Sequence, residues 1–502
     1  MLRTLTADIL TYWRARPLTA FAIFAGALTA LRILGLLYAD ADLGPDEAQY
    51  WVWSKAPAFG YYSKPPLIAW AIAATTAVFG DKEWAVRLSA PFFHLGSAFF
   101  LFALARRLYG ARIGFWAGAG WLTLPGAAFS SALITTDAPL LFFWTAALYF
   151  FFRALNAGTR GGSLLAAFAL GGAIGLGLLS KYAMIYFPLG IALALALSAK
   201  ARARFQWPHA AITLAVAGAV VAPNLFWNAN HDFETIAHTA KNANWSENLF
   251  HPEELGEFLA AQFGVFGPLT AIVLIWGLVT LARRLKAAGE ERGDDLALLA
   301  LAVPPLLIVS VQALLARAHA NWAACAYPAA LILVTAWAAR ARLGVLIRAS
   351  AGAHLAVCLA FLAIFTNFAL ADTLGLSNAV KRVRGWQAQG EFVKARASGY
   401  DAILVDDREL MSALLYYARG GPPVVAWNSN WRIDDHYEAF MAYDPASQPR
   451  VLFVALDAGA LAVREGFQTI ADVDAMTADL QRGRKRTLYL FDVTDYVGRA
   501  GG

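Results

Sequence analysis

Long apolar stretches, almost free of charged residues, recur along the chain from Leu18 to Ala371. Each is roughly 17–25 residues long, the length that a helix needs to cross the hydrocarbon core of a bilayer. The chain is therefore expected to be an α-helical polytopic membrane protein. No small-residue cleavage site follows the first stretch, so we expect an uncleaved first span. The pattern predicts about eleven transmembrane helices, near residues 18–37, 84–105, 112–132, 137–153, 163–180, 182–199, 209–227, 257–282, 296–316, 321–339 and 350–371.

One further apolar run, Pro66–Gly80, has only 15 residues. That length is short for a span and typical of an interfacial segment, so we expect the run to lie along the membrane surface. If it crossed the bilayer, all later loops would invert and their basic clusters would face outward, against the positive-inside rule. With the run outside the bilayer, the cytoplasmic side holds the N-terminus and the basic clusters within 106–112, 153–160, 200–204, 283–292 and 340–348.

Beyond Asp372 the long apolar stretches stop, and short runs rich in Val, Ile, Leu and Phe alternate with polar, helix-like stretches. This pattern is typical of a small soluble α/β domain. An odd number of spans places it opposite a cytoplasmic N-terminus, on the periplasmic side of the membrane. We predict a transmembrane domain at 1–377 and an α/β domain at 378–502. The expected strands are Ala402–Val405, Pro423–Ala426, Arg450–Val454 and Thr487–Phe491.

Composition agrees with a membrane protein and argues against other classes. Of the 502 residues, 59% are hydrophobic and 15% are charged, against about 45–50% and 25% in an ordinary soluble domain. The net charge of +6 comes from basic loops that set membrane orientation, so no nucleic-acid partner is expected. Cys325 and Cys358 both lie inside apolar stretches and imply no disulfide framework.

The first loop on the predicted outer side, Tyr38–Glu83, carries the most informative polar residues. Pro45 suits the first position of a helix, and Asp46 and Glu47 follow in its first turn, where the helix dipole favours negative charge. Helix capping is therefore one interpretation of the two carboxylates. The same short helix carries tyrosine and tryptophan residues suited to the bilayer surface, which would hold the carboxylates over an outer cavity. In the second interpretation a carboxylate acts there as a general base.

Lys64 is the principal cation of this loop. Pro65 and Pro66 follow it, stiffen the backbone and start a surface helix, so the ammonium group is expected near headgroup depth. One interpretation is a lysine that only snorkels to the membrane surface. The other is a contact to a phosphate, for which a fixed cation at this depth is suited.

Polar residues also gather at the predicted outer ends of later spans, namely Asp137, Lys181, Arg317 and Asn321. Ionisable residues at a membrane boundary are costly, so each is a site candidate by default. For Asp137 the alternative is a helix N-cap, a position that favours aspartate. Cations grouped opposite two carboxylates would suit a phosphate leaving group facing a general base.

The loop Asn228–Gly256 contains His231, His238 and His251 together with acidic residues. With Asp46 or its neighbour, these histidines could ligate a divalent metal, but they lack tight ligand spacing, so solvated loop histidines are favoured. No cofactor is certain from the sequence, and a divalent metal stays open. His231 remains a candidate for the wall of the cavity.

These polar residues form four motifs: Asp46-Glu47, Tyr61-x-x-Lys64-Pro65-Pro66, Asp137 with Pro139, and Ser180-Lys181. As a set, over roughly residues 1–340, they resemble the polyprenyl-phosphate-sugar-dependent branch of the C-type glycosyltransferase superfamily. That branch includes the protein O-mannosyltransferases and the lipid A aminoarabinose transferase. The resemblance implies a multi-helix core, amphipathic juxtamembrane helices in the first loop, a periplasm-facing cavity and a soluble C-terminal domain.

The resemblance also implies a reaction. An acceptor hydroxyl would attack the anomeric carbon of the sugar, a carboxylate would take its proton, and polyprenyl phosphate would leave. No Gly-rich nucleotide-binding motif occurs in the outer loops, consistent with a lipid-linked donor. The implied roles are catalysis for Asp46 and Glu47, contact with the donor phosphate for Lys64, Tyr61, Lys181 and Arg317, and the cavity or acceptor side for Asp137, Asn321 and His231.

Two positions depart from the family pattern. Gln49 stands where the aminoarabinose transferase has the arginine of an Asp-Glu-x-Arg pattern, and Ser63 replaces an acidic residue before the lysine. Both departures leave the identity of the sugar open. The expected partners are the polyprenyl-phosphate-linked sugar, membrane lipids and an acceptor, which is lipid A, lipopolysaccharide core, another envelope glycan or a protein.

Two other functions remain open from the sequence. A lipid or glycolipid transporter or flippase would also place charges in a membrane cavity, but usually near the midplane rather than at one boundary. A polysaccharide ligase or polymerase would share the lipid-linked donor and transfer longer glycans.

Overall fold

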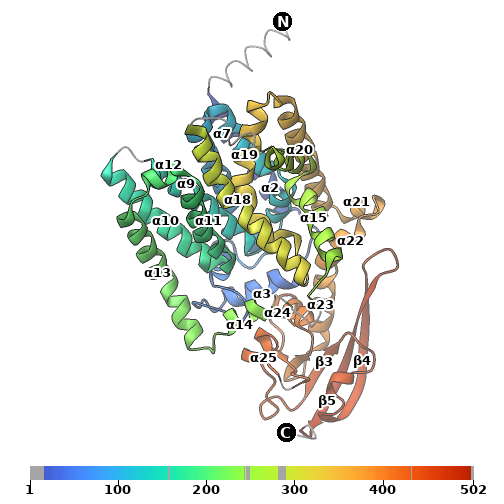
Figure 1. The fold of residues 1–502 in the computed structure, drawn as a ribbon. Helices are drawn as coiled ribbons and strands as arrows, with labels where there is room; N and C mark the ends of the chain where they lie inside the picture. The colour runs from blue at the N-terminus through green and yellow to red at the C-terminus, as the bar shows by residue number, and fades with distance from the viewer. Residues whose placement is uncertain are drawn as a thin grey trace. The chain divides into compact units, whose positions relative to one another are not determined.

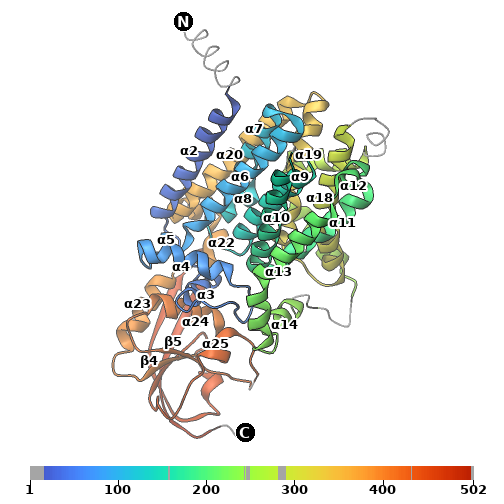
Figure 2. The same ribbon diagram turned by 90° about the vertical axis from the view of Figure 1, so that its left-hand side faces the viewer.

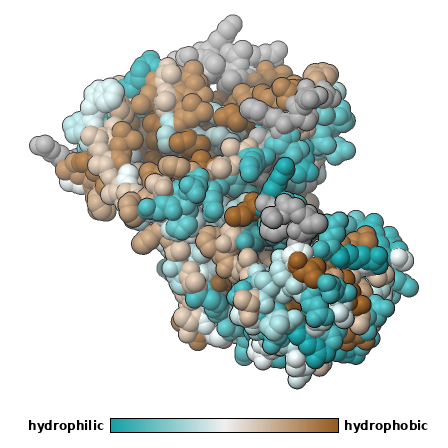
Figure 3. Space-filling model, turned by 90° about the horizontal axis from the view of Figure 1, so that it is seen from below, coloured by the Kyte–Doolittle hydropathy of each residue, from teal (hydrophilic) through white to brown (hydrophobic). Residues whose placement is uncertain are grey.

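The computed structural model describes residues 16–156, 159–241, 244, 249–280, 290–430 and 432–498. The chain forms two compact units. The membrane unit comprises residues 1–37, 64–68 and 87–362, and the loop-and-sheet unit comprises residues 38–63, 69–86 and 363–502. Figure 3 shows mostly hydrophobic residues on the surface of the helices and mostly hydrophilic ones on the sheet, as expected where one part faces lipid and the other water.

The membrane unit is a bundle of long apolar helices (Figure 1, Figure 2). Within the described residues, eight helices are long and apolar enough to cross a membrane, and up to nine if one bent pair counts as a single span. The multi-pass helical architecture predicted from the sequence is confirmed. The eight are α2 (Pro17–Leu37), α5 with α6 (Glu83–Arg87 and Ser89–Tyr109), α9 (Asp137–Leu155), α10 (Arg160–Ser180), α13 (Trp207–Ala229), α18 (Glu290–Leu315), η2 with α19 (Ala320–Ala326 and Tyr327–Arg340) and α20 (Gly344–Thr366).

The remaining expected spans are helical but broken or short. The segment near 112–132 divides into α7 (Ala111–Thr123) and α8 (Pro125–Ser130), and that near 182–199 into η1 (Tyr182–Ile185) and α11 (Tyr186–Leu197). The segment near 257–282 is the bent pair, α15 (Pro252–Phe266) and α16 (Pro268–Val279), whose axes differ by 114°.

The sharp bend between α15 and α16 has a local cause. Gly267 adopts φ +82°, a left-handed conformation that glycine accepts without steric cost. Pro268 follows and lacks the N–H that would continue the helix. The side chain of His354 also packs against Gly267 so closely that a Cβ atom there would collide with the ring.

Helices α6 and α7 approach closely because α7 presents small residues to α6. A Cβ on Gly114 would lie 2.8 Å from the carbonyl oxygen of Phe102, and one on Gly118 would lie 2.9 Å from that of Ala98. Small residues of this kind let helices in a membrane pack backbone to backbone.

An ion-pair network joins α18 to its neighbours at the start of that helix. Asp294 accepts a hydrogen bond from Lys200 (2.8 Å), which lies on the short helix α12 (Ala199–Arg204). Asp295 accepts bonds from Tyr109 (2.7 Å), Trp337 (2.9 Å) and Arg340 (2.8 Å). Because every donor comes from a different helix, or a different turn of one helix, the two carboxylates tie these elements together.

The sheet of the loop-and-sheet unit has five strands in the order β2-β1-β3-β5-β4. Strands β1 (Ala402–Val405), β2 (Val424–Ala426) and β3 (Val451–Ala455) are parallel, whereas β4 (Phe467–Asp479) and β5 (Lys485–Tyr496) form a long antiparallel hairpin joined to β3 through β5. The helices α23 (Trp386–Arg396) and α24 (Arg408–Tyr417) belong to the same unit. The α/β class and four strands expected from the sequence are confirmed; β4 was not foreseen.

Segments of the first loop pack within this same unit. They form α3 (Pro45–Ser54) and most of α4 (Leu67–Phe79), which coincides with the short apolar run expected at the membrane surface. Tyr417 accepts a bond from the backbone N–H of Leu43 (2.6 Å) and donates one to Glu83 (2.6 Å). Asp42 accepts a bond from the backbone N–H of Trp386 (2.7 Å). The position of α4 relative to a bilayer and a domain boundary at residue 377 stay predictions.

Candidate functional site

The helix α3 begins as the sequence predicts, with Pro45 in its first turn. Glu47 accepts a hydrogen bond from the backbone N–H of Gly44 (3.0 Å) and is only 4% exposed. Glu47 therefore satisfies a backbone N–H at the start of α3 that has no carbonyl partner within the helix. Helix capping accounts for the position of Glu47, and a catalytic role for it stays a prediction.

Asp46 differs from its neighbour because its side chain is 58% exposed. Both terminal nitrogens of Arg408, the first residue of α24, lie 3.2 Å from Oδ1 of Asp46. Nη1 of Arg408 also donates to Oε1 of Gln49 (2.5 Å), one helical turn along α3. Asp46 is thus a solvent-facing carboxylate whose Oδ1 is held in place, while Oδ2 lies outside these contacts.

The charge of Arg408 is favoured by this arrangement. Burial opposes the guanidinium charge, but the Asp46 carboxylate beside it raises the pKa of Arg408 above its ordinary value. Sequence reasoning missed this residue, because Arg408 follows the helix cap Asp407 in an ordinary polar stretch. Nothing local to that stretch indicates a partner more than 350 residues away.

Tyr61 is buried and holds the first loop together. Its hydroxyl donates to the carbonyl of Trp53 (3.0 Å) and accepts from the N–H of Ala58 (3.0 Å), and its ring stacks on Trp53 at a centroid distance of 4.8 Å. Burial raises the pKa of Tyr61. These contacts are structural, and its contact with a donor phosphate stays a prediction. Lys64 begins the short segment 64–68 that belongs to the membrane unit, and it is partly buried there.

Three of the predicted boundary residues meet in the membrane unit. Asp137 is 6% exposed; its Oδ1 accepts a bond from Lys181 (2.7 Å) and its Oδ2 one from Asn321 (2.6 Å). Lys181 lies in the extended break between α10 and η1, and Asn321 lies in η2. Asp137 is the first residue of α9 but not its cap, which is Thr136, so the N-cap interpretation is wrong.

Arg317 and His231 lie elsewhere on the membrane unit. Arg317 is exposed in the turn between α18 and η2. The ring of His231 stacks on that of Trp227 at a centroid distance of 4.0 Å. Its Nδ1 lies 2.8 Å from the carbonyl oxygen of Trp227. No group of three or more His, Cys, Asp or Glu side chains suited to a metal ion occurs in the part of the chain that the structure describes.

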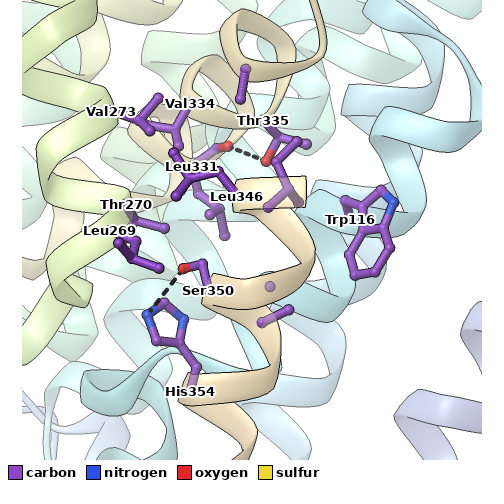
Figure 4. Close-up of a pocket in the computed structure, with 14 residues that line it drawn as sticks. Trp116, Leu269, Thr270, Val273, Leu331, Val334, Thr335, Leu346, Ser350 and His354 are labelled. Atoms are coloured by element: carbon purple, nitrogen blue, oxygen red, sulfur yellow. Dashed lines mark hydrogen bonds between the residues drawn. The ribbon is translucent and has the colours of Figure 1, made fainter. Parts of the chain in front are cut away.

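A cavity in the membrane unit is distinct from these residues. It lies among α7, α16, α19 and α20, has a volume of about 30 Å³, and has a mainly apolar lining in which Ser350 and His354 interact at 3.3 Å (Figure 4). A space of this size holds about two water molecules. None of the predicted site residues lines it, and it is too small for a sugar.

Comparison with known proteins identifies the family. Residues 63–227 match the family model described as dolichyl-phosphate-mannose-protein mannosyltransferase. Over 415 residues the chain is 35% identical to the lipid A galacturonosyltransferase RgtD of Rhizobium johnstonii, covering 80% of this chain and 83% of that protein. The chain belongs to the C-type glycosyltransferase superfamily. The predicted family and the predicted activity, a membrane glycosyltransferase, are therefore confirmed, and the transporter alternative is not supported.

Solved structures show the same fold. The crystal structure of ArnT from Cupriavidus metallidurans bound to undecaprenyl phosphate matches with a TM-score of 0.68 at 15% identity, covering 93% of this chain and 97% of that one. The oligosaccharyltransferase AglB of Archaeoglobus fulgidus, in complex with an inhibitory peptide and a dolichol-phosphate, matches with a TM-score of 0.53 at 14% identity, over 88% of this chain and 70% of that one.

Proposed function

We propose that this glycosyltransferase moves a sugar from a polyprenyl-phosphate donor to lipid A, with galacturonic acid as the first sugar to test. The relative RgtD is a lipid A galacturonosyltransferase, and the structural neighbour ArnT binds undecaprenyl phosphate. The observation that carries the proposal is the exposed carboxylate of Asp46, held through Oδ1 by Arg408. The other oxygen of this carboxylate accepts no hydrogen bond from the residues that the structure describes, and such an oxygen is suited to take the proton of an acceptor hydroxyl.

In the proposed reaction, an acceptor hydroxyl oxygen forms a bond to the anomeric carbon of the donor sugar. The bond from that carbon to the phosphate oxygen breaks, and polyprenyl phosphate leaves with the bonding electrons. Asp46 takes the proton of the hydroxyl through Oδ2. Arg408 and Gln49 keep the carboxylate oriented, so Arg408 is a positioning residue in this mechanism.

Lys64 is proposed to stabilise the negative charge that develops on the leaving phosphate. Lys181 is a weaker candidate for that role, because its ammonium group is already paired with Asp137 at 2.7 Å. We assign Lys181, Asp137 and Asn321 instead to the wall of the periplasm-facing substrate cavity that the family resemblance implies, where a paired carboxylate avoids the cost of an unpaired charge. Supporting roles for Tyr61, Arg317, Glu47 and His231 remain subordinate proposals.

We further propose that the protein lies in a bacterial inner membrane with its N-terminus in the cytoplasm and residues 378–502 in the periplasm. The bias of lysine and arginine toward one set of loops supports this orientation. A donor linked to a polyprenyl phosphate can be present on the periplasmic face, where no nucleotide sugar is needed.

The proposal is tested by mass spectrometry of lipid A from cells with and without the gene, and by transfer in detergent from a polyprenyl-phosphate galacturonic acid to purified lipid A. We expect a mass increment of one hexuronic acid in both. Omitting the lipid-linked donor, or supplying the nucleotide sugar instead, is the matched control and should give no product. Unchanged lipid A in cells together with no transfer in vitro would refute the proposed substrates.

A further inference from the structure

Two segments far apart in the sequence form a cationic surface on the loop-and-sheet unit. One segment, 374–381, follows α20 and the short helix α21 (Phe368–Thr373), and the other, 480–485, is the turn between β4 and β5 (Figure 1). Arg484 donates a hydrogen bond to the side-chain oxygen of Asn378, and the guanidinium of Arg482 packs on Gly375. We call this surface the hairpin-tip patch, defined by Leu374, Leu376, Lys381, Arg482, Arg484 and Lys485.

The charge of the patch is not neutralised within the described part of the chain. None of its four cations forms an ion pair there, whereas the neighbouring Arg382 pairs with Glu409 (2.7 Å) and Arg384 with Asp372 (3.0 Å). The carboxylate of Asp479, the strand partner of Lys485, accepts a bond from the N–H of Gln481 (2.7 Å) and so stabilises the turn itself. Arg482, Arg484 and Lys485 are exposed and Lys381 is half-buried. Cations gathered in this way repel one another unless an anion lies near them.

Two exposed leucines accompany these cations. Leu374 is 59% and Leu376 is 44% exposed. They follow Thr366, the last residue of the membrane-spanning helix α20, by eight and ten residues. Because six of the intervening residues are helical, with a rise of about 1.5 Å each, the chain keeps both leucines within roughly 20 Å of the end of the span.

We propose that the hairpin-tip patch binds phosphate-bearing lipid headgroups at the membrane surface. Leu374 and Leu376 enter the headgroup region, and Lys381, Arg482, Arg484 and Lys485 contact the phosphates. Apolar side chains flanked by cations are the combination that holds a peripheral surface on an anionic membrane. This inference does not depend on the substrates proposed above, because none of these residues takes part in the proposed transfer.

The test uses the full chain in lipid nanodiscs of phosphatidylcholine alone, with added phosphatidylglycerol, or with added lipid A. Hydrogen exchange of residues 374–381 and 480–485 is measured by mass spectrometry. We expect exchange to slow in discs with a phosphate-rich anionic lipid, and the effect to vanish at high salt, which screens surface charge. Protection by phosphatidylglycerol identifies bulk phospholipid as the ligand, and protection by lipid A alone identifies the phosphorylated glycolipid.

The decisive variant is Arg482→Gln with Lys485→Gln, which leaves the bond from Arg484 to Asn378 intact. Each cation near an anionic surface contributes a factor of about five, so this variant should lose most of the lipid-dependent protection. The control variant is Arg432→Gln with Arg464→Gln, which replaces two exposed arginines outside the patch. It makes the same charge change and should retain the lipid-dependent protection. The variant Leu374→Ser with Leu376→Ser should lose protection at unchanged charge.

Equal exchange in all three bilayers, or equal loss of protection in the patch variant and its control, would overturn the proposal. The Asp46→Asn variant should keep the protection, which separates lipid binding by the patch from sugar transfer.

Discussion

The carboxylate of Asp46 and the carboxylate of Glu47 occupy consecutive positions on one helix, yet their surroundings differ. Glu47 is buried and bonded to the start of α3, whereas Asp46 faces solvent beside Arg408. A general base needs a carboxylate oxygen that the substrate can reach, as in Asp46. The carboxylate of Glu47 instead accepts a hydrogen bond from the backbone N–H of Gly44. The two acidic residues that the sequence presents as a pair therefore have separate proposed roles.

Asp46→Asn should lower kcat by about 10²–10⁴, the usual effect of losing a general base. The amide has the same shape and still accepts a bond from Arg408, so the melting temperature and the affinity for donor should change little. Turnover with a polyprenyl-phosphate sugar measures the effect. Asp472→Asn, an exposed carboxylate on β4, is the matched control and should keep full activity. Wild-type turnover in the Asp46→Asn variant would show that Asp46 only stabilises the start of α3 and is not the general base.

Arg408→Gln should lower kcat while leaving the KM for the donor nearly unchanged, because it releases Oδ1 of Asp46 without removing the base. Exposed ion pairs contribute about 0–1 kcal/mol to stability, so the melting temperature should fall only slightly. Arg408→Lys should restore part of the rate, since it restores the charge but not the two-nitrogen contact. Equal falls in rate and in folded fraction, without rescue by lysine, would show that Arg408 is merely structural.

Lys64→Ala should weaken use of the lipid-phosphate donor much more than it weakens folding. A lysine that only anchors the chain at the membrane surface contributes on the order of 1 kcal/mol, whereas a contact to the leaving phosphate strengthens as negative charge develops. Donor affinity, turnover and melting temperature of Lys64→Ala and Lys64→Arg separate the two roles. Full turnover and donor affinity in Lys64→Ala would exclude the phosphate contact.

At the scale of elements, α3 is held at both ends by elements distant in the sequence. Arg408 on α24 contacts its first turn. Near its last residue, the indole ring of Trp53 lies against His436, the first residue of α25 (His436–Phe440), at a centroid distance of 5.4 Å. In the membrane unit, Asp137 likewise joins the start of α9 to the break after α10 and to η2. Both arrangements place polar residues at helix ends, where backbone geometry changes and side chains from several elements converge.

His436 makes the loop-and-sheet unit sensitive to acid. Burial lowers the pKa of His436 to about 4, and its Nδ1 has no hydrogen-bond partner among the described residues. The unfolded chain takes up a proton near pH 6.5, but the folded chain does not until about pH 4. The contribution of the neutral His436 to stability is therefore fully present above pH 6.5 and is lost as the pH falls toward 4, by up to about 1.4 kcal/mol per pH unit.

We expect the melting temperature to fall between pH 7 and pH 5, and His436→Phe to flatten this dependence. The ring of phenylalanine can keep the contact with Trp53 and never titrates. An identical slope in His436→Phe and the parent protein would contradict the assignment.

At the scale of the whole molecule, the proposed orientation in the membrane depends on the odd number of expected spans and on the basic loops. A phosphatase fused after residue 502 should be active, and a cytoplasm-dependent fluorophore fused there should be dark. An inactive phosphatase together with a bright fluorophore would show that the C-terminal region lies in the cytoplasm, contrary to the proposed orientation. The same fusions placed in the basic loop near residue 342 should give the opposite pattern and provide the control.

Much of this architecture was predictable because its causes are local. The bilayer demands long apolar helices, so the spans are visible as uninterrupted stretches. The strands β1, β2 and β3 are fully buried, and β5 is buried at Leu488, Leu490, Phe491 and Val493 in its middle, so each contains a short apolar run. Strand β4 was not predicted because most of its side chains are exposed and polar residues interrupt its apolar ones, so its extended form depends on pairing with β5.

The sequence by itself determined the membrane class, the α/β nature of the C-terminal region, the short helix bearing Asp46 and the family resemblance, since each depends on composition or spacing over a few dozen residues. Only the tertiary structure decided that Arg408 holds Asp46, that Asp137 pairs with Lys181 and Asn321 rather than capping a helix, and that the β4–β5 turn joins the segment after α20. Those contacts unite residues from 44 to more than 300 positions apart. No local pattern encodes such a pairing, because it arises only when the chain brings separate helices and strands to the same place.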